Sequence, residues 1–247
     1  MSDVALVVMA RYPQPGTTKT RLARSLGDAE THRLYQAFLT DLAGHFAGPD
    51  FALHWAYTPA DVDYAAFVRE LVPDLAGYTH SFPQQGADFG ARLLHAFQWT
   101  QRQGYAAAIV IGSDSPHITR ALVCQAQAAL QEADVVLGPA DDGGYYLIAM
   151  REPYDVFTSI PMSTSVVTAL TMARARELDL TVKLIDPLFD VDEYADLLRL
   201  AELLRVDHAL APATSAVITS LRSELYDHDS TYVCDPTGRY PAALDLP

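Results

Sequence analysis

Apolar residues gather in short runs along the chain, and segments with a helical spacing of apolar positions separate most of these runs. The runs occupy residues 3–9, 51–57, 78–82, 106–111, 134–137, 145–150 and 181–185. A continuous apolar run without polar alternation is typical of a strand that is buried on both faces of a parallel sheet. We therefore expect strands at these positions.

Helical periodicity fills the intervals between the predicted strands. In the interval 28–46, for example, Leu34, Phe38 and Leu42 recur at helical spacing. Asp61 and Thr119 are the expected N-caps of two other helices. Helices are predicted from residue 20, at 28–46, 61–71, from 88, and at 119–132, 164–178, 193–205 and 212–226.

This alternation of strands and helices predicts a three-layer α/β/α domain. The run at 145–150 follows the run at 134–137 too closely for a crossover helix. We therefore expect a mostly parallel sheet that one antiparallel strand interrupts. No change in composition marks a linker before residue 207, so residues 1–207 are predicted as one domain. Residues 208–247 are predicted as a C-terminal extension that packs on the domain or on a neighbouring subunit, which leaves a homo-oligomer open.

The chain has 247 residues, half of them hydrophobic, and a formal net charge of −14. Such a charge argues against nucleic acid as a partner, because backbone phosphates require a basic face. A small phosphorylated ligand needs only a local cluster of cations. No apolar run is long enough to cross a bilayer, and no signal peptide is expected. The two cysteines do not suggest a disulfide framework, so we expect reduced thiols in a cytoplasmic protein.

The loop after the first predicted strand is the first candidate site. Arg11, Lys19 and Arg21 lie in a segment with Gly16, and the segment leads into a helix. Cationic side chains beside the backbone N–H groups at the start of a helix suit a phosphate or diphosphate. The alternative is a surface loop whose charges are solvated.

A carboxylate follows the strand at 106–111 and forms the second candidate site. In an α/β sheet, ligands bind beyond the carboxyl ends of the strands, and Asp114 has that position. Asp192 also follows a strand and precedes a helix. Mg²⁺ and Mn²⁺ are bound by carboxylates together with substrate phosphates, so Asp114 and Asp192 are the candidate metal ligands. The alternative for Asp114 is a helix cap.

Two further features have a functional and a structural interpretation. In the segment Asp141-Asp-Gly-Gly-Tyr-Tyr146, Asp142 can act as a base or bind a sugar hydroxyl, and the glycines let a ligand approach. A tight hairpin would use Asp-Gly for conformational reasons alone. Arg92 can reach a phosphate, or pair with Asp88 one helical turn earlier.

Four motifs together resemble the DUF2064 family. They are residues 10–22 (Ala-Arg-Tyr-Pro-Gln-Pro-Gly-Thr-Thr-Lys-Thr-Arg-Leu), Gly112-Ser-Asp-Ser-Pro116, residues 137–148 around Asp-Asp-Gly-Gly-Tyr-Tyr, and Asp190-Val-Asp192. The resemblance covers roughly residues 4–205. It implies the glycosyltransferase-A (GT-A), or nucleotide-diphospho-sugar transferase, fold.

The resemblance also implies roles for individual residues. Asp114 would hold the metal, Asp192 would be the second acid, and the loop from Arg11 to Arg21 would bind the nucleotide phosphates. Sugar or acceptor would contact Asp142, Gly143, Gly144 and Tyr145, together with Ser163 and Thr164. The family often has Trp-Ser-Thr where this chain has Met162-Ser163-Thr164.

Three functions are consistent with these residues. The first is a metal-dependent transferase that moves a sugar from a nucleotide-diphosphate donor to a small acceptor. The second is a nucleotidyltransferase that joins a nucleoside triphosphate to a phosphorylated or carboxylated substrate and releases pyrophosphate. The third is a non-catalytic protein that binds nucleotide-sugars.

Overall fold

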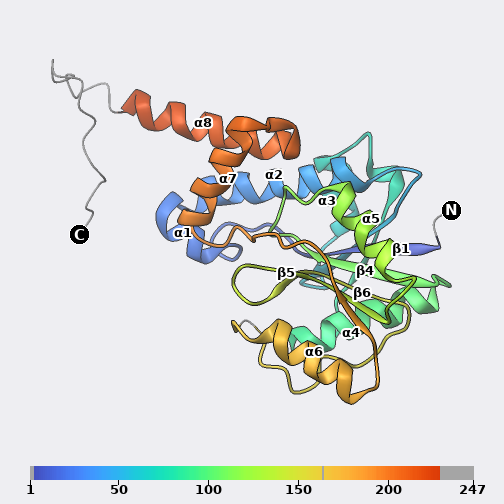
Figure 1. Cartoon of the computed structure of the whole chain (residues 1–247). Helices are drawn as coiled ribbons and strands as arrows, with labels where there is room; N and C mark the ends of the chain where they lie inside the picture. The colour runs from blue at the N-terminus through green and yellow to red at the C-terminus, as the bar shows by residue number, and fades with distance from the viewer. Residues whose placement is uncertain (1–2, 163, 229–247) are drawn as a thin grey trace.

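The computed structural model describes residues 3–162 and 164–228, and Figure 1 shows their arrangement. Within them the strands are β1 (Val4–Arg11), β2 (Ala52–Thr58), β3 (Thr79–Pro83), β4 (Ala107–Gly112), β5 (Val135–Pro139), β6 (Tyr145–Met150) and β7 (Val182–Leu184). The α-helices are α1 (Thr20–Leu26), α2 (Asp28–Phe46), α3 (Tyr64–Leu71), α4 (Phe89–Arg102), α5 (Arg120–Ala129), α6 (Val167–Glu177), α7 (Tyr194–Val206) and α8 (Pro212–His228).

The strands form one seven-stranded sheet in the order β3-β2-β1-β4-β6-β5-β7. β1 pairs in parallel with both β2 and β4, so the strand order reverses between β1 and β4. A reversal of this kind opens a crevice beyond the carboxyl ends of the two strands. The crevice here is next to Arg11 at the end of β1 and Gly112 at the end of β4.

β6 is antiparallel to both of its neighbours, β4 and β5, and the remaining pairings are parallel. This confirms the expected antiparallel strand in a mostly parallel sheet. The connection from β5 to β6 is a short loop, residues 140–144, at the edge of the sheet where β4 also ends. The loop therefore lies beside the carboxyl end of β4.

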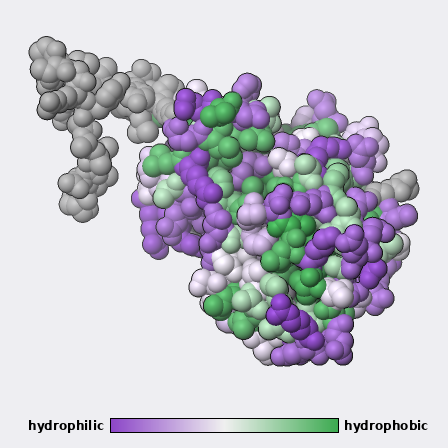
Figure 2. Space-filling model, viewed as in Figure 1, coloured by the Kyte–Doolittle hydropathy of each residue, from purple (hydrophilic) through white to green (hydrophobic). Residues whose placement is uncertain are grey.

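Helices cover both faces of the sheet, which confirms the three-layer architecture (Figure 1). On one face, the strands pack against buried residues of α2, α3, α5 and α7, including Phe38, Phe67 and Val123. On the other face, they pack against α4 and α6, through Leu93 and Phe97 among others. In Figure 2 hydrophilic residues surround a group of hydrophobic ones near the middle of the face shown.

Three local predictions need correction. Asp63, not Asp61, caps α3, because its side chain accepts a hydrogen bond from Ala66 N at 2.8 Å. α6 begins at Val167 instead of 164, after a turn in which Val167 N donates to Thr164 O. α5 ends at Ala129, three residues before the predicted end at 132. Thr119 caps α5 as expected, through a bond from Leu122 N.

The described part of the predicted C-terminal extension is held by α2. Asp41 is buried in α2, and its carboxylate accepts hydrogen bonds of 2.8 Å from Ala213 N and Thr214 N at the start of α8. These bonds satisfy two of the N–H groups that a helix start leaves without partners. The boundary at 207 stays a prediction, and residues 229–247 lie outside the described residues.

A buried histidine leads to a prediction about stability and pH. His54 in β2 is 2% exposed, stacks on His80, and lies 3.0 Å from Tyr105 Oη. Burial, together with the neighbouring His80, lowers the pKa of His54 from 6.5 to about 4. In this interval the unfolded chain binds the proton and the folded chain does not.

The free energy of unfolding should therefore be unaffected by His54 above pH 6.5 and should fall as pH decreases from 6.5 to 4. Replacing His54 by Phe removes this titration, so the variant should show a shallower slope. Urea unfolding at closely spaced pH values measures the slope. His208→Phe, on the surface, is the control and should keep the wild-type slope; equal slopes for all three proteins would contradict the prediction.

Candidate functional site

Two adjoining cavities lie beyond the carboxyl ends of the strands, at the reversal of strand order between β1 and β4. The first has a volume of about 400 Å³. It is lined by Met9, Ala10, Arg11, Thr17, Thr18, Lys19, Thr20, Arg21, Tyr35, Thr58, Gln84, Phe89, Arg92, Gly112, Ser113, Asp114 and Asp192. The cavity thus brings together the predicted phosphate and metal residues, which come from distant parts of the chain.

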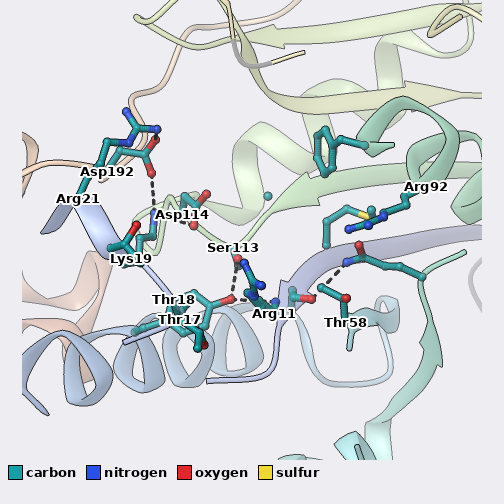
Figure 3. Close-up of a pocket in the computed structure, with 17 residues that line it drawn as sticks. Arg11, Thr17, Thr18, Lys19, Arg21, Thr58, Arg92, Ser113, Asp114 and Asp192 are labelled. Carbon is teal, nitrogen blue, oxygen red and sulfur yellow. Dashed lines mark hydrogen bonds and ion pairs between the residues drawn. The ribbon is translucent and has the colours of Figure 1, made fainter. Parts of the chain in front are cut away.

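Cationic side chains stand on several sides of this first cavity. Arg11, Lys19, Arg21 and Arg92 all line it, and Figure 3 shows Arg92 well apart from Lys19 and Arg21. Arg92 comes from α4, and its Nε donates to Gly86 O at 3.4 Å. The alternative pairing of Arg92 with Asp88 is absent from the described residues, where Asp88 caps α4 by accepting from Ala91 N.

Lys19 joins the two acids that the sequence analysis assigned to a metal. Its Nζ lies 2.7 Å from Asp114 Oδ1 and 2.9 Å from Asp192 Oδ1, and it also donates to Val191 O at 2.8 Å. An ammonium group has three N–H donors, so these three acceptors use its full capacity. Lys19 adopts a left-handed backbone conformation, with φ 53° and ψ 43°, which is uncommon for a residue other than glycine.

The charges of this group stabilise one another. Burial alone would lower the pKa of Lys19, but the carboxylates of Asp114 and Asp192 outweigh it and raise the pKa above 10.5. Burial would raise the pKa of Asp192, whereas Lys19 and then Arg21 lower it below 3.8. Arg21 Nη2 lies 3.0 Å from Asp192 Oδ2. Lys19 and Asp192 are therefore both charged at neutral pH.

Hydrogen bonds also fix the floor of the first cavity. Tyr35 Oη accepts from Arg11 N at 3.1 Å and lies 3.0 Å from Ser113 Oγ, so it connects the ends of β1 and β4. Burial raises the pKa of Tyr35 to about 12. Gln84 Nε2 donates to Ala10 O and to Ala56 O. These bonds connect the segments that line the cavity.

The second cavity, of about 370 Å³, has a different lining. Arg21, Phe89, Gly112, Asp114 and Asp192 also border it, so the two cavities meet at the pair of acids. Its other polar lining includes Asp142, Asp190 and Thr164, and its apolar lining includes Leu93, Val110, Ile148, Met162 and Val167. The lining of the second cavity therefore combines acidic side chains with apolar ones.

Asp190 also lines the second cavity, although it was not predicted as a site residue. Its Oδ1 accepts a hydrogen bond of 2.5 Å from Ser115 Oγ. Burial raises the pKa of Asp190 to about 7; Ser115 opposes the rise, whereas Asp114 and Asp142 add to it. The spacing Asp190-Val-Asp192 was a usable signal, because residues two apart in an extended segment can border the same site.

Gly143 and Gly144 shape the loop that carries Asp142. Gly143 has φ +89°, and a Cβ placed on it would lie 2.0 Å from Ser165 O. Gly144 N donates to Asp142 Oδ1 at 2.8 Å, which holds that carboxylate at the rim. Thr168 N donates to Gly143 O and connects the loop to α6. Gly143 is thus required for the loop to pack against Ser165.

The predicted site residues are distributed as follows. Arg11, Lys19, Arg21, Arg92, Asp114 and Asp192 line the first cavity, and Asp142, Gly144, Tyr145 and Thr164 line the second. Gly16 and Gly143 line neither cavity and act on loop conformation instead. Ser163 lies outside the described residues. Thr17 and Thr18, within the predicted phosphate loop, also line the first cavity, and so do Tyr35, Thr58, Gln84 and Ser113, which were not predicted as site residues.

The carboxylates fit a divalent cation only in combination with ligand oxygens. Within residues 3–162 and 164–228, no three His, Cys, Asp or Glu side chains form a group that would hold a metal. Asp114 is 40% exposed, and its Oδ1 contacts Lys19. Its Oδ2 has no hydrogen-bond or ion-pair partner among the described residues. Mg²⁺ commonly uses one or two carboxylates and completes its coordination with phosphate oxygens and water.

The ion pairs of Lys19 generate a prediction about stability. Lys19→Met should lower the free energy of unfolding by about 2 kcal/mol, because it leaves the partly buried Asp114 without a cation and Asp192 with Arg21 alone. Adding Asp192→Asn to Lys19→Met should restore part of the loss, since it removes one of these negative charges. Urea unfolding of the single and double variants measures the effect.

Arg21→Met is the control for that experiment. Arg21 also pairs with Asp192, but its side chain is 58% exposed, so its loss should cost at most about 1 kcal/mol. A loss for Lys19→Met no larger than that for Arg21→Met would contradict the prediction. So would a double variant less stable than Lys19→Met alone.

A further prediction concerns the loop that contains Gly143. Gly143→Ala should destabilise the protein more than Gly27→Ala does. Both glycines have φ near +80 to +90°, but a Cβ on Gly27 meets nothing within 4 Å, whereas one on Gly143 meets the backbone of Ser165. Gly27, with φ 81° and ψ 161°, thus gives the cost of a backbone conformation that favours glycine without a close contact, on the order of 1–3 kcal/mol. Equal losses in thermal unfolding would rule out the close contact.

Comparison with known proteins assigns the chain to a family and a fold. The model of the family described as "Uncharacterized protein conserved in bacteria (DUF2064)" matches residues 46–164. A candidate nucleotide-diphospho-sugar transferase from Desulfovibrio desulfuricans G20 is 31% identical, with a TM-score of 0.82 over 92% of this chain and 99% of that chain. The search of curated proteins gave no match.

More distant structures share the fold alone. A 4-diphosphocytidyl-2C-methyl-D-erythritol synthase from Anaerococcus prevotii DSM 20548 is 8% identical, with a TM-score of 0.54 over 83% of this chain and 99% of that chain. A cytidylyltransferase from Leptospira borgpetersenii is 10% identical, with a TM-score of 0.50 over 95% of this chain and 100% of that chain. In the described residues, no helix is both long and apolar enough to cross a membrane. By its family match and its 31% identical relative, the chain belongs to the DUF2064 family.

Proposed function

We propose that the protein is a metal-dependent transferase that moves a sugar from a nucleotide-diphosphate donor to a small acceptor. The observation that carries this proposal is the meeting of two unlike cavities at Asp114 and Asp192. One cavity supplies cations for a diphosphate, and the other offers carboxylates and apolar walls. A group transferred from one ligand to another needs such a junction.

The donor occupies the first cavity in this proposal. Arg11, Arg21 and Arg92 bind the diphosphate, and Arg92 contacts it from the side away from Lys19. Lys19 keeps Asp114 and Asp192 together and contributes positive charge at the wall. Fixed cations around a departing diphosphate stabilise the charge that develops on it in the transition state.

Asp114, with Asp192, would hold the divalent cation. When bound, that cation supplies further neutralisation of the leaving diphosphate. Asp114 suits this position because it is 40% exposed at the boundary between the cavities and its Oδ2 faces no protein partner among the described residues. Lys19 holds the other oxygen and so orients the carboxylate.

The acceptor occupies the second cavity. Asp142 borders this cavity, and a hydrogen bond from Gly144 N orients its Oδ1. We assign to Asp142 the contact with the attacking hydroxyl, from which it takes the proton. Tyr145, Gly144 and Thr164 line the same space. The D. desulfuricans relative, described as a candidate nucleotide-diphospho-sugar transferase, supports the same reaction class.

Binding of nucleotides tests the donor site directly. The wild type should be stabilised by at least one of UDP, GDP, ADP, CDP or their glucose conjugates, and only with Mg²⁺ or Mn²⁺. A ligand at 100 times its dissociation constant stabilises by about 2.7 kcal/mol, or roughly 5–10 °C for a chain of this size. Differential scanning fluorimetry measures the shift.

Two variants serve as the comparison. Asp114→Ala should abolish the metal-dependent shift. Glu132→Ala also removes an acid paired with a lysine, Lys183, but on the surface, and should keep the shift. If no nucleotide stabilises the wild type under any metal condition, the proposal is wrong.

Product analysis then separates the two transfer reactions. Release of a nucleoside diphosphate from the stabilising nucleotide-sugar supports glycosyl transfer. Release of pyrophosphate from a nucleoside triphosphate would instead show nucleotidyl transfer. Binding without any product under either condition would identify a non-catalytic binder.

A further inference from the structure

We propose that the second cavity selects an uncharged acceptor with an apolar body and hydroxyl groups, and that it rejects acceptors bearing a phosphate or carboxylate. This inference rests on the proposed function, because it specifies the substrate class of the acceptor site. It is carried by the division of charge between the two cavities and by the apolar walls of the second.

The polar lining of the second cavity is acidic. Asp114, Asp142, Asp190 and Asp192 all border it, and the only cationic side chain among its lining residues in the described chain is Arg21. Arg21 is already engaged, because it lies 3.0 Å from Asp192 and 3.5 Å from Glu193. Asp142 has no ion-pair partner among the described residues, so an anionic acceptor beside it would meet an unpaired carboxylate, and like charges at short range repel each other.

The cations that would suit an anion stand on the other side of the junction. Arg11 and Arg92 line the first cavity and not the second. Lys19 likewise borders only the first cavity, and its ammonium is shared by Asp114 and Asp192. These three cations therefore line only the cavity proposed for the donor, and none of them lines the cavity proposed for the acceptor.

The rest of the second cavity favours an apolar group. Phe89, Leu93, Met162 and Val167 border it, and Phe89 is 46% exposed although it is a large hydrophobic residue. Such walls gain stability by covering an apolar ligand surface. Because carboxylate oxygens accept hydrogen bonds, Asp142 suits a ligand that donates through hydroxyl groups.

A matched pair of probes tests this selectivity. Phenyl β-D-glucoside and phenyl β-D-glucuronide differ only in a hydroxymethyl group that is replaced by a carboxylate. We expect the wild type to bind the glucoside at least about tenfold more tightly, measured by ligand-observed NMR or calorimetry. Raising the salt concentration should reduce the preference, since salt screens exposed charges.

Charge reversal on the loop provides the decisive comparison. Asp142→Lys should reduce the preference below about twofold or reverse it. Asp141→Lys changes the neighbouring residue, which pairs with Arg199 and does not line the cavity, and should keep a preference above about fivefold. If Asp142→Lys does not fold by circular dichroism, Asp142→Asn should show a smaller reduction in the same direction.

The outcomes distinguish this inference from the proposed function. Equal or tighter binding of the glucuronide by the wild type, no detectable binding of the glucoside, or an unchanged ratio in Asp142→Lys and Asp142→Asn would overturn the inference. The nucleotide shift, measured on the same samples, tests the proposed function separately. Its absence would overturn the donor assignment while the ratio of the two probes still measures the selectivity of the cavity.

Discussion

The ammonium of Lys19 is the constraint on which the rest of the site depends. It joins the loop after β1, the end of β4 and the segment before α7, over a sequence separation of up to 173 residues. Val191 N also donates to Asp114 O, so the two acidic segments are joined through the backbone as well. Without this cation, two partly buried carboxylates would repel each other at the junction of the cavities. Lys19 thus makes it possible for Asp114 and Asp192 to share one boundary.

The cations and the acids of the site come from different parts of the chain. The cations of the first cavity, Arg11, Lys19, Arg21 and Arg92, all precede β4 in the chain, whereas the acids of both cavities begin with Asp114 at its end. The strand order places the earlier strands on one side of β4 and the later strands on the other. A chain with a net charge of −14 can therefore present a cationic pocket, because its few basic residues in this region converge on one side. Net charge describes the partners of the whole surface and not those of a recessed site.

Periodicity was sufficient to predict most of the fold, because burial on one or both faces leaves a direct record in the order of apolar residues. The antiparallel β6 was also predictable, from the length of the loop before it. The exact start of α3 was not, since Asp61 and Asp63 are both acceptable caps in the sequence.

For the site, the sequence predicted which strand ends contribute residues, but it did not predict how the side chains are arranged in space. Gln84 directly follows β3, so it also lies beyond the carboxyl end of a strand, which is the position that identified Asp114. The neighbouring sequence does not show whether such a glutamine lines a cavity or is exposed to solvent. The bridging role of Lys19 depends on a contact across most of the chain, which no local pattern contains.

The family match and the geometry of the site cover different parts of the chain. The matched residues 46–164 include Asp114 and Asp142, whereas Lys19 and Asp192 lie outside this range. The 31% identical relative extends the likeness to 92% of the chain, so it spans both parts. Two structures at 8–10% identity share the fold alone, so this fold is compatible with very different side chains. What a member of this fold accepts must then be set by the segments beyond the strand ends. In this chain those segments add Met162, Phe89 and a group of carboxylates to the strand residues that line the second cavity, so its mixed acidic and apolar lining comes largely from them.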